Sequence, residues 1–144
     1  MQVRLILGIM SVVFQSPVFP GAARDDEVAR LRVPPHSIEA EQSVLGGMML
    51  SKDAIADVVE MVRGNDFYRP AHEAVYDAIV DLYGRGEPAD AVTVSAELTK
   101  RGELARIGGA PYLHTLISSV PTAANAGFYA RIVRERAVLR KLVD

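Results

Sequence analysis

Few side chains in this chain could carry chemistry, and those few are scattered. The three histidines, His36, His72 and His114, fall on three different segments. No H-E-x-x-H pattern and no second ligand at helical spacing accompanies any of them, so the sequence predicts no metal site. A lone histidine in such a setting is typical of a surface residue, or of a core residue whose ring nitrogens are hydrogen-bonded.

Phosphate-binding and nucleophile motifs are also absent. Glycine pairs occur at Gly46-Gly47 and Gly108-Gly109, but no G-x-x-x-x-G-K-[ST], G-x-G-x-x-G or G-x-S-x-G pattern surrounds them. Asp77 and Asp81 stand four residues apart, and we interpret them as a solvated helix face rather than as paired catalytic carboxylates. The sequence therefore predicts no catalytic residue, no bound cofactor and no enzymatic activity for this chain.

The amino-acid composition excludes further classes of site. The chain has 144 residues, of which 49% are hydrophobic, and this is enough for one domain with its own core. The absence of cysteine removes disulfides, thiolate nucleophiles and cysteine-based zinc sites. With only 6% aromatic residues and no tryptophan, stacking platforms for bases or sugars are disfavoured.

Charge is segregated along the chain. Residues 33–103 hold six Lys or Arg against thirteen Asp or Glu, whereas residues 104–144 hold six against two. An acidic body with a basic C-terminal arm favours a surface built for a neighbouring molecule. The alternative is a solvated helix face that happens to be rich in arginine.

The first residues differ from the rest. Leu5–Phe14 is a mostly apolar run behind Arg4, followed by prolines and by the small residues 21–23. The run is shorter than the roughly 20 residues that span a bilayer, but it has the outline of a secretory signal. Extra sequence upstream of the natural start and an artefact are the competing interpretations.

From residue 34 onward, helix start and stop signals alternate with apolar stripes of helical period. The predicted starts are Ser37, Ser51, Pro70, Thr93, Pro111 and Thr122, and the predicted stops include Gly64, Gly84, Gly102 and Pro121. Glu39 and Glu41 fall in the first turn after Ser37, where acidic side chains suit the helix dipole. Gly46-Gly47, inside the first stripe, indicates close packing rather than a stop.

We therefore predict an all-α fold, a compact bundle of about six helices between Ser37 and Asp144. The predicted core consists of Leu45, Val58, Val62, Phe67, Val75, Ile79, Leu82, Leu98, Leu113 and Leu116. The last helix carries Phe128, Ile132, Leu139, Leu142 and Val143 along one side and has no stop signal near Asp144. We interpret the chain as the front piece of a longer protein.

Five segments resemble the N-terminal domain of DnaB-type bacterial replicative DNA helicases, in the order of that family. They are PPHSIEAEQSVLGG (34–47), DFYRPAH (66–72), DLYGRGEPAD (81–90), GGAPYL (108–113) and VPTAANA (120–126), which continues into YARIV (129–133). The resemblance covers about 110 residues, and the sequence is most similar in character to actinobacterial members of the family. Residues 1–31 match nothing in the family.

The resemblance implies a cytoplasmic, helical collar domain without ATPase chemistry and with no membrane contact. It implies three regions: an atypical N-terminal extension outside the core (1–31), a globular domain (32–121) and the first arm of a helical hairpin (122–144). A RecA-like motor beyond residue 144 would hold ATP and Mg²⁺ and make most of the DNA contacts. The implied partners are other helicase subunits, in a hexamer built as a trimer of dimers, and the C-terminal domain of primase.

The expected partner-binding residues lie in the C-terminal third. They are Tyr112, Tyr129, Ile132, Leu139 and Val143, with Arg131, Arg134 and Arg136 around them. Four of these residues form an apolar seam along the last helix: Tyr129, Ile132, Leu139 and Val143. If the last helix folds back, this seam would be buried internally instead. Two other functions stay open from the residues alone: an independent exported helical interaction protein, and a weak nucleic-acid-binding module using the basic last helix.

Overall fold

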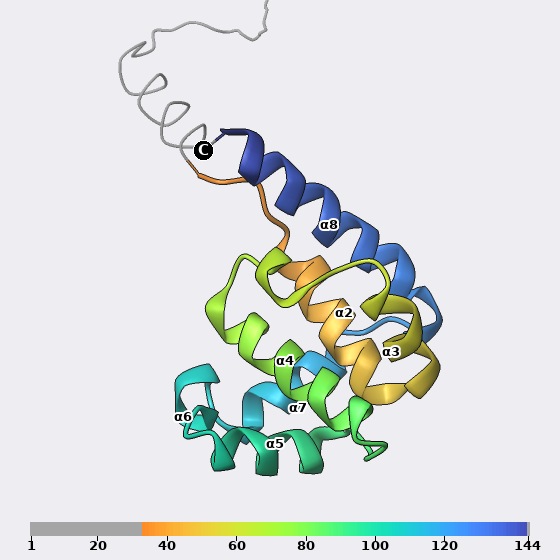
Figure 1. The fold of residues 1–144 in the computed structure, drawn as a ribbon, viewed down its shortest axis with the longest axis vertical. Helices are drawn as coiled ribbons and strands as arrows, with labels where there is room; N and C mark the ends of the chain where they lie inside the picture. The colour runs from red at the N-terminus through yellow and green to blue at the C-terminus, as the bar shows by residue number, and fades with distance from the viewer. Residues whose placement is uncertain (1–32, 144) are drawn as a thin grey trace, which may run out of the picture. The chain divides into compact units, whose positions relative to one another are not determined.

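A computed structural model of the chain describes residues 33–143, and the predictions for residues 1–31 lie outside this part. From Pro35 onward the chain forms one compact unit (Figure 1). The described residues form seven α-helices and two short 3₁₀ turns, with no strand, which confirms the all-α prediction. The elements are α2 (Ile38–Leu50), α3 (Lys52–Val59), η1 (Gly64–Asp66), α4 (Pro70–Gly84), α5 (Ala91–Lys100), α6 (Leu104–Ile107), α7 (Ala110–Ser118), η2 (Ala123–Asn125) and α8 (Ala126–Val143).

Helix α2 is the central element of the bundle. It packs against α3, α4, α7 and α8, and Figure 1 shows it running through the middle of the unit. Nine of its thirteen residues are buried, so it lacks the polar face of a surface helix. The other helices bury one stripe each against α2 or against its neighbours.

The predicted core is confirmed in full. All ten residues are buried, with exposed fractions between 0% and 5%. Each lies on the apolar stripe of its segment or beside a turn, where side-chain spacing alone fixes the inward direction. The one helix without a prediction, α6, is a single turn of four residues, which is too short to show a period.

The start of α5 lies three residues before the predicted one. Asp90, not Thr93, is the N-cap: its Oδ1 accepts the Thr93 N–H at 2.9 Å, and Thr93 Oγ1 accepts the Asp90 N–H at the same distance. The two residues form a reciprocal capping box. Thr93 is thus the third helical residue of α5.

Gly64 does not end α3, which already stops at Val59. It begins η1 instead, and a Cβ placed on it would lie 2.5 Å from Asp77 Oδ1. An added methyl group would displace the Asp77 side chain, so Gly64 lies at a close approach of α4 to η1 rather than at a left-handed helix cap.

The long last helix also starts later than predicted. The Thr122 hydroxyl accepts the Ala124 N–H at 3.3 Å and so caps η2, while α8 begins at Ala126. A 3₁₀ turn leading into an α-helix is common. Thr122 is a cap, as predicted, but of the turn that precedes α8.

Tyr76 gives the fold a testable pH dependence. Its buried hydroxyl donates to the Val62 carbonyl at 2.7 Å, and burial raises its pKa from 10.0 to about 12. The folded state favours the neutral phenol, so this stabilisation is complete below pH 10 and is lost as the pH rises towards 12.

We expect Tyr76→Phe to lower the free energy of unfolding at neutral pH by about 1 kcal/mol, because the Val62 carbonyl loses this donor. The variant should also lose less stability than the unmodified chain above the ordinary tyrosine pKa. Urea unfolding across the alkaline range measures both quantities. Parallel curves for the two proteins would contradict the assignment.

Candidate functional site

A buried polar cluster joins three helices beneath the predicted partner residue Tyr112. His72 of α4 is fully buried, and its Nδ1 lies 2.7 Å from Oε1 of Glu41 on α2. Its Nε2 lies 2.7 Å from the hydroxyl of Tyr112 on α7. The histidine that the sequence assigned to a surface or a hydrogen-bonded core position is therefore a core residue with both ring nitrogens engaged.

Glu41 is the part of this cluster that sequence reasoning missed. Its position in the first turn of α2 indicated a role in the helix dipole, yet it is 1% exposed and reaches across to the start of α4. Its carboxylate accepts the Tyr68 N–H at 2.7 Å and lies 3.5 Å from the Arg69 nitrogen, in addition to the His72 contact. A buried carboxylate is tolerable because these donors replace water.

Tyr112 is half-buried and is held from several sides. Its ring is stacked nearly parallel to that of His72, with centroids 5.9 Å apart and planes inclined by 9°. The Arg69 guanidinium lies 6.0 Å from the ring centroid, and Gln42 Nε2 donates to the hydroxyl at 3.3 Å. A Cβ placed on Gly108, whose φ is +112°, would lie 3.1 Å from the Tyr112 Cβ, so glycine leaves room for the Tyr112 side chain.

Helix α8 buries a stripe of mostly small residues, which is distinct from the seam of large residues expected to bind a partner. The buried positions are Ala126, Ala130, Val133 and Ala137, at helical spacing. The seam itself divides: Tyr129 and Ile132 pack against the core, whereas Leu139 is 43% and Val143 68% exposed. The alternative in which the whole seam is buried internally is therefore wrong for its C-terminal half.

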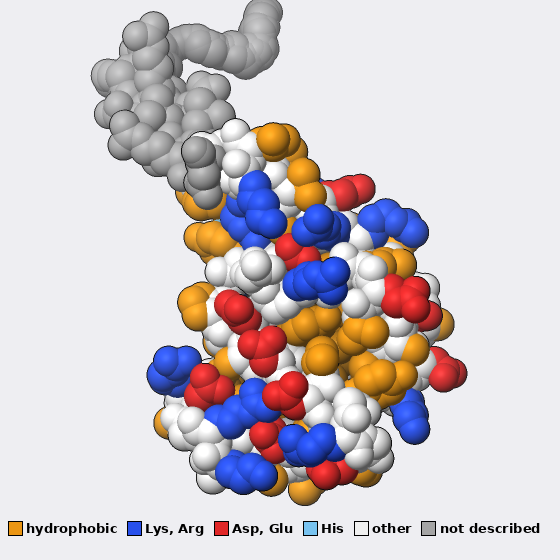
Figure 2. All heavy atoms as spheres, in the orientation of Figure 1, with side chains coloured by type: hydrophobic (Ala, Val, Ile, Leu, Met, Phe, Trp, Pro, Cys, Tyr) orange, Lys and Arg blue, Asp and Glu red, His pale blue; other side chains and the backbone are white. Residues whose placement is uncertain are grey.

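The arginines of α8 divide in the same way. Arg134 donates to the buried Asp66 carboxylate at 2.9 Å, so it fastens α8 to η1. Arg140 donates to the backbone carbonyls of Asp66 at 2.5 Å and of Pro35 at 2.9 Å. Arg131 is exposed and Arg136 half-buried. Figure 2 shows blue side chains gathered around α8 on the face drawn.

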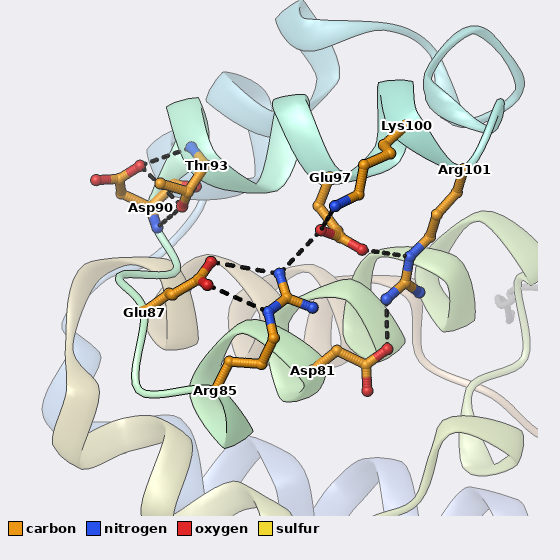
Figure 3. A network of polar contacts seen from close by, with 8 residues as sticks. All are labelled: Asp81, Arg85, Glu87, Asp90, Thr93, Glu97, Lys100 and Arg101. Carbon is orange, nitrogen blue, oxygen red and sulfur yellow. Dashed lines mark hydrogen bonds and ion pairs between the residues drawn. The ribbon is translucent and has the colours of Figure 1, made fainter.

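A second polar network ties α4 to α5 (Figure 3). The nearly buried Glu97 accepts hydrogen bonds from Arg101 Nε at 2.9 Å and from Arg85 Nη2 at 3.0 Å. These two hydrogen bonds lower the pKa of Glu97, and the one from Arg101 has the larger effect. Arg101 also pairs with Asp81, and Arg85 with Glu87. These charges neutralise one another, which indicates a structural role.

The two acids predicted as a solvated face lie in different surroundings. Asp81 is exposed and paired with Arg101, whereas Asp77 lies against Gly64. Partial burial, followed by the nearby Glu73 and Asp81, raises the pKa of Asp77. No nucleophile or histidine accompanies either acid in the interactions that the described residues make.

The remaining candidate features lie apart from one another. His36 stacks on Tyr68, with ring centroids 4.0 Å apart, and His114 is exposed on α7, so the histidines lie in separate places. Among residues 33–143 no cluster of three His, Asp or Glu could hold a metal ion. A groove of about 340 Å³ between the α2–α3 junction and the α4–α5 turn is lined mainly by apolar side chains. None of the helices in this part of the chain is long and apolar enough to cross a bilayer.

Three replicative DNA helicases named DnaB are similar to this chain. The protein from Mycobacterium leprae is 76% identical over 113 residues, covering 78% of this chain and 19% of that relative. The Leifsonia xyli protein is 64% identical over 124 residues (86% and 27%), and the Geobacillus stearothermophilus protein 50% over 112 residues (78% and 25%). The chain thus spans about a fifth to a quarter of these relatives' length.

A solved structure and a family model are also similar to this chain. The crystal structure of the N-terminal domain of DnaB helicase from Mycobacterium tuberculosis matches with a TM-score of 0.77 and 76% identity, over 77% of this chain and 80% of that one. The model of the DnaB-like helicase N-terminal domain matches residues 33–135, which is most of the described part. The chain therefore belongs to the family of DnaB-like helicase N-terminal domains.

Proposed function

We propose that this chain is a non-catalytic scaffold of a bacterial replicative helicase, which pairs helicase subunits and docks the C-terminal domain of primase. The exposed apolar end of α8 carries the proposal, supported by the helicase relatives and by the ordered, half-exposed Tyr112. ATP, Mg²⁺ and most DNA contacts would belong to a motor region of the parent protein. Such a role in replication places the protein in the cytoplasm.

The end of α8 has the character of an interface. Val138, Leu139, Leu142 and Val143 are 38% to 76% exposed on consecutive turns of one helix. Apolar side chains grouped this way typically mark a partner site, whereas single exposed ones are ordinary. The exposed Arg131 should act mainly on the association rate and on its salt dependence.

We expect Tyr112→Ala and Val143→Asp each to weaken partner binding roughly ten- to a hundred-fold, because each removes one buried contact of the complex. Calorimetric titration with the primase C-terminal domain measures primase docking. Sedimentation equilibrium measures subunit pairing.

Val92→Asp is the matched control for Val143→Asp, because Val92 is also strongly exposed (76% against 68%) but lies on α5. It should bind like the unmodified chain. If Tyr112→Ala and Val143→Asp also do so in both assays while remaining folded, the interface lies elsewhere and the proposal fails.

A further inference from the structure

We propose that His72 is a positioning residue, which fixes the orientation of the Tyr112 side chain through a buried relay from Glu41. The relay is the chain of contacts Glu41–His72–Tyr112, with both links 2.7 Å long. This inference rests on the proposed docking role of Tyr112 and adds the device that prepares that side chain for its partner.

Hydrogen-bond chemistry gives the relay one direction. A carboxylate only accepts hydrogen bonds, so the Nδ1–H of His72 donates to Glu41. In the Nδ1–H tautomer on which the proposed relay rests, the Nε2 lone pair accepts the Tyr112 O–H, and the oxygen of Tyr112 accepts from Gln42 Nε2 at 3.3 Å. Every polar atom on the path has a partner, and the opposite tautomer would leave Nδ1 facing the carboxylate without a proton.

Burial makes the relay rigid. His72 is 0% and Glu41 1% exposed. The Tyr68 N–H, in the segment before α4, donates to the Glu41 carboxylate at 2.7 Å. Ring stacking on His72 and the nearby Arg69 guanidinium restrict the Tyr112 ring in addition to its hydroxyl. A side chain that is already ordered loses less entropy on binding, so affinity depends on the relay as well as on the contact itself.

The relay is tested first without any partner. In the 144-residue chain, ¹⁵N chemical shifts of the His72 ring should report the Nδ1–H tautomer with a hydrogen-bonded Nε2. Tyr112→Phe, which keeps the ring and removes the hydroxyl, should move the Nε2 resonance and leave Nδ1 in place. A proton on Nε2, or an Nε2 resonance that Tyr112→Phe does not move, overturns the proposal.

The consequence for binding is tested by a double-mutant cycle with the primase C-terminal domain. His72→Gln should weaken binding about three- to ten-fold when Tyr112 is present, and should have no further effect in the Tyr112→Ala background. His114→Gln, an exposed histidine on α7, is the matched control and should bind normally. If His72→Gln does not fold, the single variant Tyr112→Phe is measured instead; it keeps the ring, removes the hydroxyl and should weaken binding about three- to ten-fold, and unchanged binding would overturn the positioning role.

An equal loss from His72→Gln in both backgrounds would mean a general structural effect, and would overturn the positioning role. If Tyr112→Ala leaves the affinity unchanged, the docking role of Tyr112 fails, and the ¹⁵N shifts still decide whether the relay exists. The two failures are therefore distinguishable.

Discussion

Replacing Gly46 with alanine is expected to lower the free energy of unfolding by about 3 kcal/mol, because the added methyl has no space. A Cβ at Gly46 would lie 2.1 Å from the Leu116 carbonyl oxygen and 2.3 Å from Val120 Cγ2. The nearest obstacle is backbone of α7, which cannot rotate aside as a side chain could. The α2–α7 contact must open instead, and α2 is the helix around which the bundle packs.

Two other glycines provide controls for urea unfolding followed by circular dichroism. At Gly47 the added Cβ would lie 3.2 Å from the Ala126 Cβ, so Gly47→Ala should cost less than Gly46→Ala. At Gly84, in the last turn of α4, no atom lies within 4 Å, and alanine should stabilise the protein by roughly 0.5–1 kcal/mol through helix propensity. If Gly46→Ala were as stable as Gly84→Ala, the close approach of α2 and α7 would be wrong.

Gly46 also shows how far sequence reasoning reaches in this fold. A glycine pair inside an apolar stripe indicates close packing, because its loss of helix propensity needs a compensation. The identity of the partner does not follow, since the Leu116 carbonyl is seventy positions away and belongs to another helix. Local spacing predicts which residues point inward, and tertiary contact decides what they meet.

The stripe that α8 buries against the bundle does not follow from the sequence, for a related reason. Hydrophobic periodicity gives most weight to large side chains, so the side of α8 that carries Phe128, Leu139 and Val143 dominates the pattern. The bundle buries Ala126, Ala130 and Ala137 instead, and Ala126 packs against Gly47 of α2. Small residues permit close approach of two helices, and they carry too little hydrophobicity to stand out in a sequence.

The buried carboxylate of Glu41 is the second case that spacing alone cannot predict. Its partners Tyr68 and His72 come from the segment before α4 and from α4 itself, 27 and 31 residues away. The available signal was weak: a charged residue within a helix that turns out to be buried on nearly all sides. Glu39, two positions earlier in the same first turn of α2, is exposed, as is usual for an acidic residue that interacts with the helix dipole.

Because of that burial, Glu41→Ala should lower the free energy of unfolding by about 3–4 kcal/mol, since two buried hydrogen-bond donors lose their acceptor and each unsatisfied one typically costs about 1–3 kcal/mol. The change deprives His72 of the acceptor at Nδ1 and leaves the Tyr68 N–H without this partner. Glu39→Ala in the same turn is the matched control and should change stability by no more than about 0.5 kcal/mol. Urea unfolding of both variants measures the difference.

A double-mutant cycle separates the pair from its surroundings. In Glu41→Leu/His72→Leu both polar partners are replaced by apolar groups, so neither is left buried and unpaired. Its loss of stability should be smaller than the sum of the two single changes. A residual loss should remain, because the Tyr68 N–H still lacks the acceptor that Glu41 provided. Strict additivity, or a Glu41→Ala variant as stable as Glu39→Ala, would show that the carboxylate and the imidazole do not stabilise the bundle together.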